Sequence, residues 1–145
     1  MLTVAPLMAF VATTDLARSD AFYGAVLGLA HVETTSFANV YDAAGTTLRV
    51  TLVDELADAP YTVLGWTVAD IGATMADLAA RDVVFERFGG VEQDDGGVWT
   101  APGGARIAWF RDPDGNLLSL TQQPLPDAGA AARSRTRSSD RKPAH

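Results

Sequence analysis

The chain of 145 residues contains no cysteine, which excludes disulfides, thiolate nucleophiles and zinc sites built on sulfur. It has only two histidines, His31 and the last residue, His145. No apolar run approaches the roughly 20 residues that a membrane-spanning helix needs. The first residues lack the basic leader and cleavage site of a secretory signal. These absences predict a soluble protein with no membrane partner, and a cytoplasmic location fits them.

Lysine is absent from residues 1–123, where six arginines stand against sixteen acidic residues and give a net charge of −10. Such an acidic body repels nucleic-acid phosphates, so we expect no nucleic-acid partner. Residues 124–145 carry a net charge of +3 and are rich in proline, alanine, serine and arginine. Because this segment has no apolar periodicity, we predict a disordered basic tail. A basic arm that binds nucleic acid is the alternative.

A repeat divides residues 1–123, which we interpret as one domain. Asp15 and Asp70 each follow a strand pattern and precede an alanine-rich segment, which is what a helix N-cap requires. Three strand patterns follow each helix, at 31–36, 38–43 and 47–54 and at 82–87, 105–111 and 116–122. We therefore predict an α+β fold of two βαβββ modules in tandem, at about 6–54 and 60–122. Together they form a curved, cup-like mixed sheet flanked by helices.

The segment 112–116, with the sequence DPDGN, has the composition of a tight turn between two strands. Proline fixes φ at the second position of a type I turn, and Gly115 accepts the left-handed conformation that closes a bulged hairpin. We predict turn roles for Asp112 and Asp114 rather than a catalytic acid pair. A left-handed residue also suits the end of the first helix, where Gly28 stands.

The segments DLARSDAFYGAVLGL (15–29) and ARIAWFRDPDGNLLSL (105–120), in the duplicated βαβββ order, resemble the vicinal oxygen chelate superfamily. That superfamily includes glyoxalase I, extradiol dioxygenases, fosfomycin-resistance enzymes and bleomycin-binding resistance proteins. The resemblance covers about residues 6–122 and implies a cup that holds a small molecule. It also implies a homodimer, because members often complete their cups by pairing modules across a two-fold axis. Whether these cups close within one chain or between chains is left open.

In metal-using members of the superfamily, each module supplies two ligands from its first and last strands. The resemblance places these ligands at Met8, at Val63, at Arg49 or Thr51, and at Ser119. Such side chains cannot replace the imidazole and carboxylate donors of a divalent site. We therefore predict no metal and no other cofactor. Metal-dependent glyoxalase, epimerase, transferase and dioxygenase activities are excluded on the same ground.

The same strand faces define a candidate pocket. If the turn at 112–116 closes a bulged hairpin, Trp109 lies opposite Ser119 on the face that looks into the cup. Trp109 and Phe10 are then placed to stack on a flat ligand, and Arg49 to hold an anionic group. The acidic body favours a cationic ligand instead, and a closed core filled by these residues is the alternative. The predicted ligand-binding residues are Met8, Phe10, Arg49, Thr51, Val63, Thr67, Trp109, Ser119 and Thr121.

Three functions fit these observations. The first is a metal-independent small-molecule-binding protein of the glyoxalase/bleomycin-resistance type, which sequesters an antibiotic or a metabolite by affinity alone. The second is a metal-independent isomerase or lyase that uses a pocket carboxylate as a base. The third is a subunit whose role is interaction with other proteins. The carboxylates considered for the second function are Glu33, Asp54, Glu55, Glu86 and Glu92.

Overall fold

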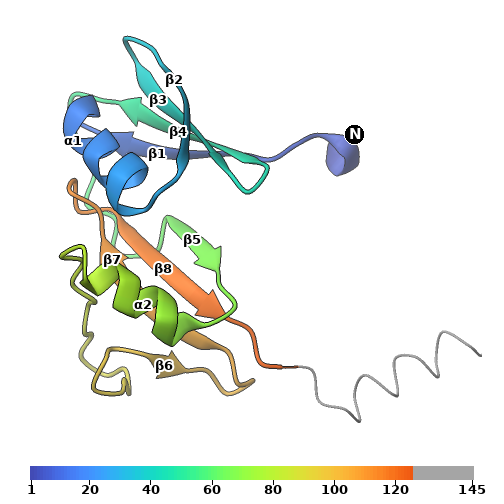
Figure 1. The fold of residues 1–145 in the computed structure, drawn as a ribbon, viewed down its shortest axis with the longest axis vertical. Helices are drawn as coiled ribbons and strands as arrows, with labels where there is room; N and C mark the ends of the chain where they lie inside the picture. The colour runs from blue at the N-terminus through green and yellow to red at the C-terminus, as the bar shows by residue number, and fades with distance from the viewer. Residues whose placement is uncertain (126–145) are drawn as a thin grey trace, which may run out of the picture.

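The computed structural model describes residues 1–125, so most of the predicted basic tail lies outside the described residues. The element order confirms two βαβββ modules (Figure 1). Module 1 follows a short helical turn, η1 (Leu2–Val4), and contains β1 (Met8–Thr13), α1 (Leu16–Asp20), η2 (Ala21–Val26), β2 (Ala30–Thr34), β3 (Ala38–Ala43) and β4 (Thr46–Leu52). Module 2 contains β5 (Leu64–Thr67), α2 (Ile71–Ala79), β6 (Trp99–Thr100), β7 (Arg106–Arg111) and β8 (Leu117–Gln122).

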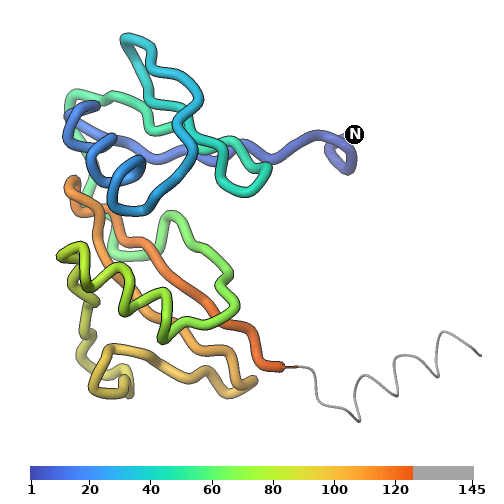
Figure 2. Tube along the Cα trace, in the orientation of Figure 1, coloured from blue at the N-terminus to red at the C-terminus, as the bar shows by residue number. Residues whose placement is uncertain are grey.

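Each module builds its own four-stranded mixed sheet. The strand order is β1-β4-β3-β2 in module 1 and β5-β8-β7-β6 in module 2. In each sheet the first strand pairs with the last strand in parallel, and the other neighbours are antiparallel. Figure 2 shows the chain completing the upper module before it enters the lower one. The fold is therefore α+β with two separate sheets, and no helix within residues 1–125 is long and apolar enough to cross a membrane.

Both helices begin where the sequence predicted. The Asp15 carboxylate accepts a hydrogen bond of 3.0 Å from the backbone N–H of Arg18, and Asp70 accepts one of 3.0 Å from Ala73. These N-caps satisfy backbone donors that have no partner within the helix. The first helix widens into the π-type turn η2 before it ends at Gly28, whose φ of +72° is the expected left-handed conformation.

The strand expected at 82–87 does not form, and this prediction was wrong. Asp82 has a φ of +67°, and beyond it only a single bridge links Phe85 to Phe110 on β7. The chain then leaves the sheet in a loop and returns at β6, which pairs with the start of β7. The edge of β7 is thus shared by two short pieces of chain, because the loop between them carries the backbone away from the ladder.

One hydrophobic core serves both modules. In β4, Leu48 and Val50 are 1% and 0% exposed, and in β8 Leu118 is 0% exposed. The ring of Phe22, from η2, lies 6.4 Å from the ring of Phe110 in the other module. Because these residues belong to a single buried cluster, neither sheet buries its apolar face alone.

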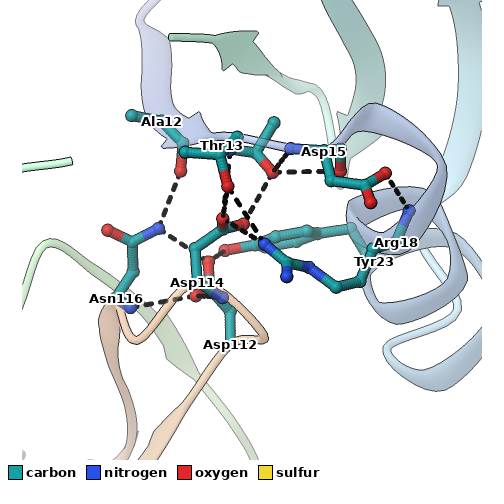
Figure 3. A network of polar contacts seen from close by, with 9 residues as sticks. Ala12, Thr13, Asp15, Arg18, Tyr23, Asp112, Asp114 and Asn116 are labelled. Atoms are coloured by element: carbon teal, nitrogen blue, oxygen red, sulfur yellow. Dashed lines mark hydrogen bonds and ion pairs between the residues drawn. The ribbon is translucent and has the colours of Figure 1, made fainter. Parts of the chain in front are cut away.

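The hairpin between β7 and β8 joins the modules through buried polar groups (Figure 3). The side chain of Asp114 is 2% exposed and accepts hydrogen bonds from the Thr13 hydroxyl at 2.6 Å and the Thr14 N–H at 3.0 Å. The guanidinium of Arg18 forms an ion pair with the same carboxylate at 2.6 Å. Burial by itself raises the pKa of Asp114, but these donors outweigh it and hold the pKa below its ordinary value.

Two further hydrogen bonds join the two modules beside Asp114. The buried hydroxyl of Tyr23 donates to the Asp112 carboxylate at 2.7 Å, and the Asn116 amide donates to the Ala12 carbonyl at 2.9 Å. Burial and the Asp112 carboxylate raise the pKa of Tyr23 well above its ordinary value. Asp112 also accepts the backbone N–H groups of Asp114 and Asn116, which closes the turn. The predicted turn role of Asp112 is therefore confirmed, whereas the Asp114 carboxylate joins the two modules instead of serving the turn.

We predict that the chain loses stability below about pH 4 through Asp114. Its folded pKa is depressed, so its contribution is fully present above the unfolded value of 3.8 and is lost as the pH falls toward the lower folded value. Urea unfolding midpoints between pH 3 and pH 6 measure this effect. Asp114→Asn should flatten the profile, whereas Asp77→Asn, on an exposed part of α2, should leave it intact. An unchanged profile in Asp114→Asn contradicts the assignment.

Candidate functional site

Each sheet has one face against the helices and one face left open. In β4, Arg49 and Thr51 alternate with the buried Leu48 and Val50 and are themselves half-buried on the opposite side. In β8, half-buried residues alternate with buried ones in the same way. We call the sides opposite the helices the open faces. They carry the residues that the alternation of side chains along each strand predicted to face the cup.

The open face of module 1 combines exposed apolar side chains with a cation. In the parallel register of β1 and β4, Phe10 is the partner of Arg49, and Ala12 is the partner of Thr51. Phe10 is 61% exposed and Met8 is 50% exposed in the single chain. These are large exposed apolar surfaces for side chains of a sheet strand.

The open face of module 2 is aromatic and carries hydroxyl groups. Trp109 is the partner of Ser119, and Ser119 is also the partner of Gly65 on the other side of β8. The ring of Trp109 meets Phe88 edge-to-face at 5.5 Å and lies 6.3 Å from Trp99. The sequence reasoning missed Phe88, which lies in the loop after the missing strand and follows no strand pattern.

The predicted residues do not fill a closed core in the described chain. The predicted residues on β4, β7 and β8 are half-buried, and those on β1 and β5 are exposed. Val63 departs from this pattern, because it lies one residue before β5 and packs against the core. The structure therefore brings the predicted residues to two open faces, with Val63 at their margin.

Four hollows in the described part of the chain lie mostly away from these faces. One, of about 180 Å³, lies on the helix side between the modules and is lined by residues that include Leu29, Trp66 and Phe110. Of the predicted site residues, only Thr67 lines any of the four. The open faces are thus exposed surfaces in the single chain rather than the walls of an enclosed pocket.

The residues on the open faces do not fit a divalent metal. Arg49 and Ser119 occupy equivalent positions in the two modules. Arg49 pairs with Phe10, and Ser119 pairs with Gly65, which is the residue of module 2 equivalent to Phe10. By the resemblance, metal-using members place ligands at these positions and at Met8, and their sites are built from imidazole and carboxylate donors. A guanidinium repels a cation, and a thioether and a hydroxyl are poor ligands for the metals concerned. Within residues 1–125, no three histidine or acidic side chains cluster as a metal site would need.

Of the carboxylates considered as a base, one lies on an open face. Glu33 is the partner of Val40, which is itself the partner of Arg49, so the three share one side of the sheet. Glu86 lies 3.6 Å from Arg111 in an ion pair. Asp54 and Glu55 lie in the link between the modules, and Glu92 lies in the loop before β6, on the rim of a hollow that also includes Trp99.

Solved structures with the same fold support this architecture. A superfamily member from Sphaerobacter thermophilus has a TM-score of 0.66 at 22% identity, covering 85% of this chain and 100% of that chain. A fosfomycin resistance protein from Listeria monocytogenes has a TM-score of 0.67 at 16% identity, covering 85% and 97%. A lactoylglutathione lyase from Agrobacterium tumefaciens has a TM-score of 0.64 at 18% identity, covering 82% and 93%. At these identities the likeness shows the fold alone.

The sequence itself matches the family model of the glyoxalase/bleomycin resistance protein/dioxygenase superfamily over residues 4–120. No curated protein sequence matches the chain at a significant level. The matched region includes both modules and ends within β8, so the family model spans the two open faces and the hairpin that joins them. The chain belongs to the glyoxalase/bleomycin resistance protein/dioxygenase superfamily, which is also called the vicinal oxygen chelate superfamily.

Proposed function

We propose that this protein binds a small organic molecule on its open faces without a metal ion. One observation carries the proposal: the faces that form the cup in this fold present aromatic, apolar and hydroxyl side chains but no set of metal donors. A binding protein needs affinity and shape rather than a nucleophile, and apolar walls with a few polar groups provide both.

The two open faces supply complementary parts of such a site. Trp109, with Phe88 and Trp99 around it, offers a rigid aromatic wall. Ser119 and Thr121 lie on the same face as hydrogen-bonding groups, and Phe10 and Met8 offer a second apolar surface on module 1. A flat ligand between the two faces would bury these apolar groups and form hydrogen bonds with the hydroxyls. Both contacts would contribute to its binding free energy.

We also propose that two copies of the chain close the cup. β1 is an edge strand of its sheet, and it carries Met8 and Phe10 in solvent together with Leu7, which is 75% exposed. An apolar edge of this kind favours pairing with another chain. A second copy is the simplest partner, because a two-fold axis would place the face of module 1 opposite the face of module 2.

Two of the solved structures with this fold carry names that refer to the compounds on which those proteins act. One is named for resistance to the antibiotic fosfomycin and another for lyase activity on a glutathione conjugate. We therefore propose an antibiotic or a metabolite as the ligand here, held in the cytoplasm. Sequestration would protect the cell by affinity alone.

A metal-independent isomerase or lyase is the second candidate, and the position of Glu33 favours it over other catalytic schemes. Glu33 is a carboxylate on the open face of module 1, where it could remove a proton from a bound ligand. Once a ligand is known, turnover by the native chain that Glu33→Gln abolishes, with binding retained, would establish this function. Binding without turnover leaves the protein as a binding module.

The binding proposal predicts that Trp109 determines ligand affinity. In a thermal-shift screen of aromatic antibiotics and organic acids, at least one compound should raise the melting temperature. Trp109→Leu should weaken binding of that compound about tenfold, because it removes the aromatic wall. Trp66→Leu makes the same change on the helix side of the sheet, so it should lower stability but retain affinity. Equal affinity in both variants would place the ligand elsewhere.

The dimer proposal predicts that Phe10→Ser gives a monomer. The side chain is largely in solvent in the single chain, so its removal should hardly change the stability of the monomer. It should greatly weaken the association of two chains. Sedimentation or light scattering measures the mass across a range of protein concentrations. Val84→Ser removes another apolar side chain, 76% exposed but in the loop of module 2, and should leave the dimer intact. A monomeric native chain contradicts the proposal directly.

Divalent metals should leave the melting temperature unchanged. The positions that would hold a metal carry Met8, Arg49 and Ser119, and none of these replaces imidazole or carboxylate. Manganese, nickel, zinc and ferrous ions, each tested with and without EDTA, measure this. A rise in melting temperature that EDTA reverses would show that donors elsewhere in the chain form a site.

A further inference from the structure

Arg49 is a half-buried cation without a protein partner in the described structure. Neither a hydrogen bond nor an ion pair joins its guanidinium to any residue from 1 to 125, although the chain around it is strongly acidic. Four of the arginines elsewhere are engaged: Arg18 and Arg111 form ion pairs with Asp114 and Glu86, and Arg81 and Arg87 donate to backbone carbonyls. A partly desolvated guanidinium gains most from a carboxylate or a phosphate, which its planar fork of donors matches.

The nearest acidic groups on the same face do not neutralise Arg49. Asp42, on β3, accepts the backbone N–H of Gly45 at 3.0 Å and so serves the turn. Glu33 lies two strands away on β2 and forms no ion pair with Arg49. Between them, the side chains next to Arg49 in register are apolar: Phe10 on β1 and Val40 on β3. The positive charge is therefore flanked by apolar walls.

Thr51 provides a second, independent observation. Its side chain lies two residues along β4, on the same face as Arg49, and its hydroxyl is buried without a hydrogen-bond partner. An unpaired buried hydroxyl costs free energy that a suitable acceptor would recover. An anionic oxygen held by Arg49 on the same face would be an acceptor of this kind for the Thr51 hydroxyl.

The position of Arg49 in the fold strengthens this argument. Arg49 matches Ser119 in the other module, so the two residues stand at the centres of their faces. Metal-using relatives, by the resemblance, place a ligand at each of these positions, and a metal there supplies positive charge to a bound oxygen. In this chain the guanidinium itself brings a fixed positive charge to that place.

We propose that the cup selects a flat organic anion, with a carboxylate on Arg49 and Thr51 and an apolar ring against Phe10. This inference rests on the proposed binding function and resolves the choice between cationic and anionic ligands in favour of the anion. The acidic surface of the protein opposes the approach of such a ligand, whereas the local guanidinium and the surrounding apolar walls favour it once bound.

The test compares three probes of one shape: 2-naphthoate, the neutral 2-naphthamide and the cationic 2-naphthylmethylammonium. Calorimetry with the full chain measures each dissociation constant. We expect naphthoate to bind about 10-fold to 100-fold more tightly than the amide, as a charge-assisted bond to a guanidinium implies. Arg49→Gln should reduce naphthoate to the affinity of the amide and leave the amide unchanged. Thr51→Val should weaken naphthoate by a smaller factor.

Arg106→Gln is the matched control, because it removes an arginine of β7 whose parity places it away from the open face. Folding is checked by the melting temperature, which Arg49→Gln should barely change since Arg49 has no partner to lose. If naphthoate and the amide bind equally, or the cation binds best, the anion inference is overturned while the binding function stands. If a folded dimer binds none of the three probes, both proposals are overturned.

Discussion

The carboxylate of Asp114 is the constraint on which the arrangement of the two modules depends. It is almost fully buried, and it would be costly to bury without the Thr13 hydroxyl, the Thr14 N–H and the Arg18 guanidinium that meet it. All three donors belong to module 1, so the charge is satisfied only when the hairpin of module 2 sits against β1 and α1. The shared hydrophobic core then closes around Phe22 and Phe110. The hydrogen bonds and the ion pair of Asp114 fix how the two modules align, and burial of apolar side chains stabilises their contact.

The same period-two alternation that builds the core also sets the chemistry of the open faces. Leucine, valine and phenylalanine occupy the alternate strand positions that face the core. The positions between them face away from the core and carry Arg49, Ser119 and Trp109. Replacement of metal donors by these residues changes no core contact. The superfamily fold can therefore keep its shape while the residues on its open faces vary.

Much of this was predictable from the sequence because it is local. The caps at Asp15 and Asp70, the turn at Gly115 and the pairing of Trp109 with Ser119 follow from short patterns whose partners lie within a few residues. The missing strand at 82–87 was not predictable, because its fate depends on competition with β6 for one edge of β7. The hydrogen bonds between the modules and the contact of Phe88 with Trp109 join segments that are far apart in the sequence or outside any strand. No local sequence pattern predicts such contacts.

The bonds between Asp114 and module 1 also bear on the order in which the chain can fold. The Thr13–Asp114 bond spans a sequence separation of 101 residues, so β1 leaves the ribosome long before its partner exists. Until residue 116 has emerged, the end of β1 and the start of α1 lack the carboxylate that engages their donors. Module 1 is therefore synthesised before the hairpin that covers part of its core face. Contacts between distant segments form slowly, and exposed apolar surface favours association in the meantime. Docking of the hairpin between β7 and β8 onto module 1 thus needs residues that are synthesised after the whole of module 1.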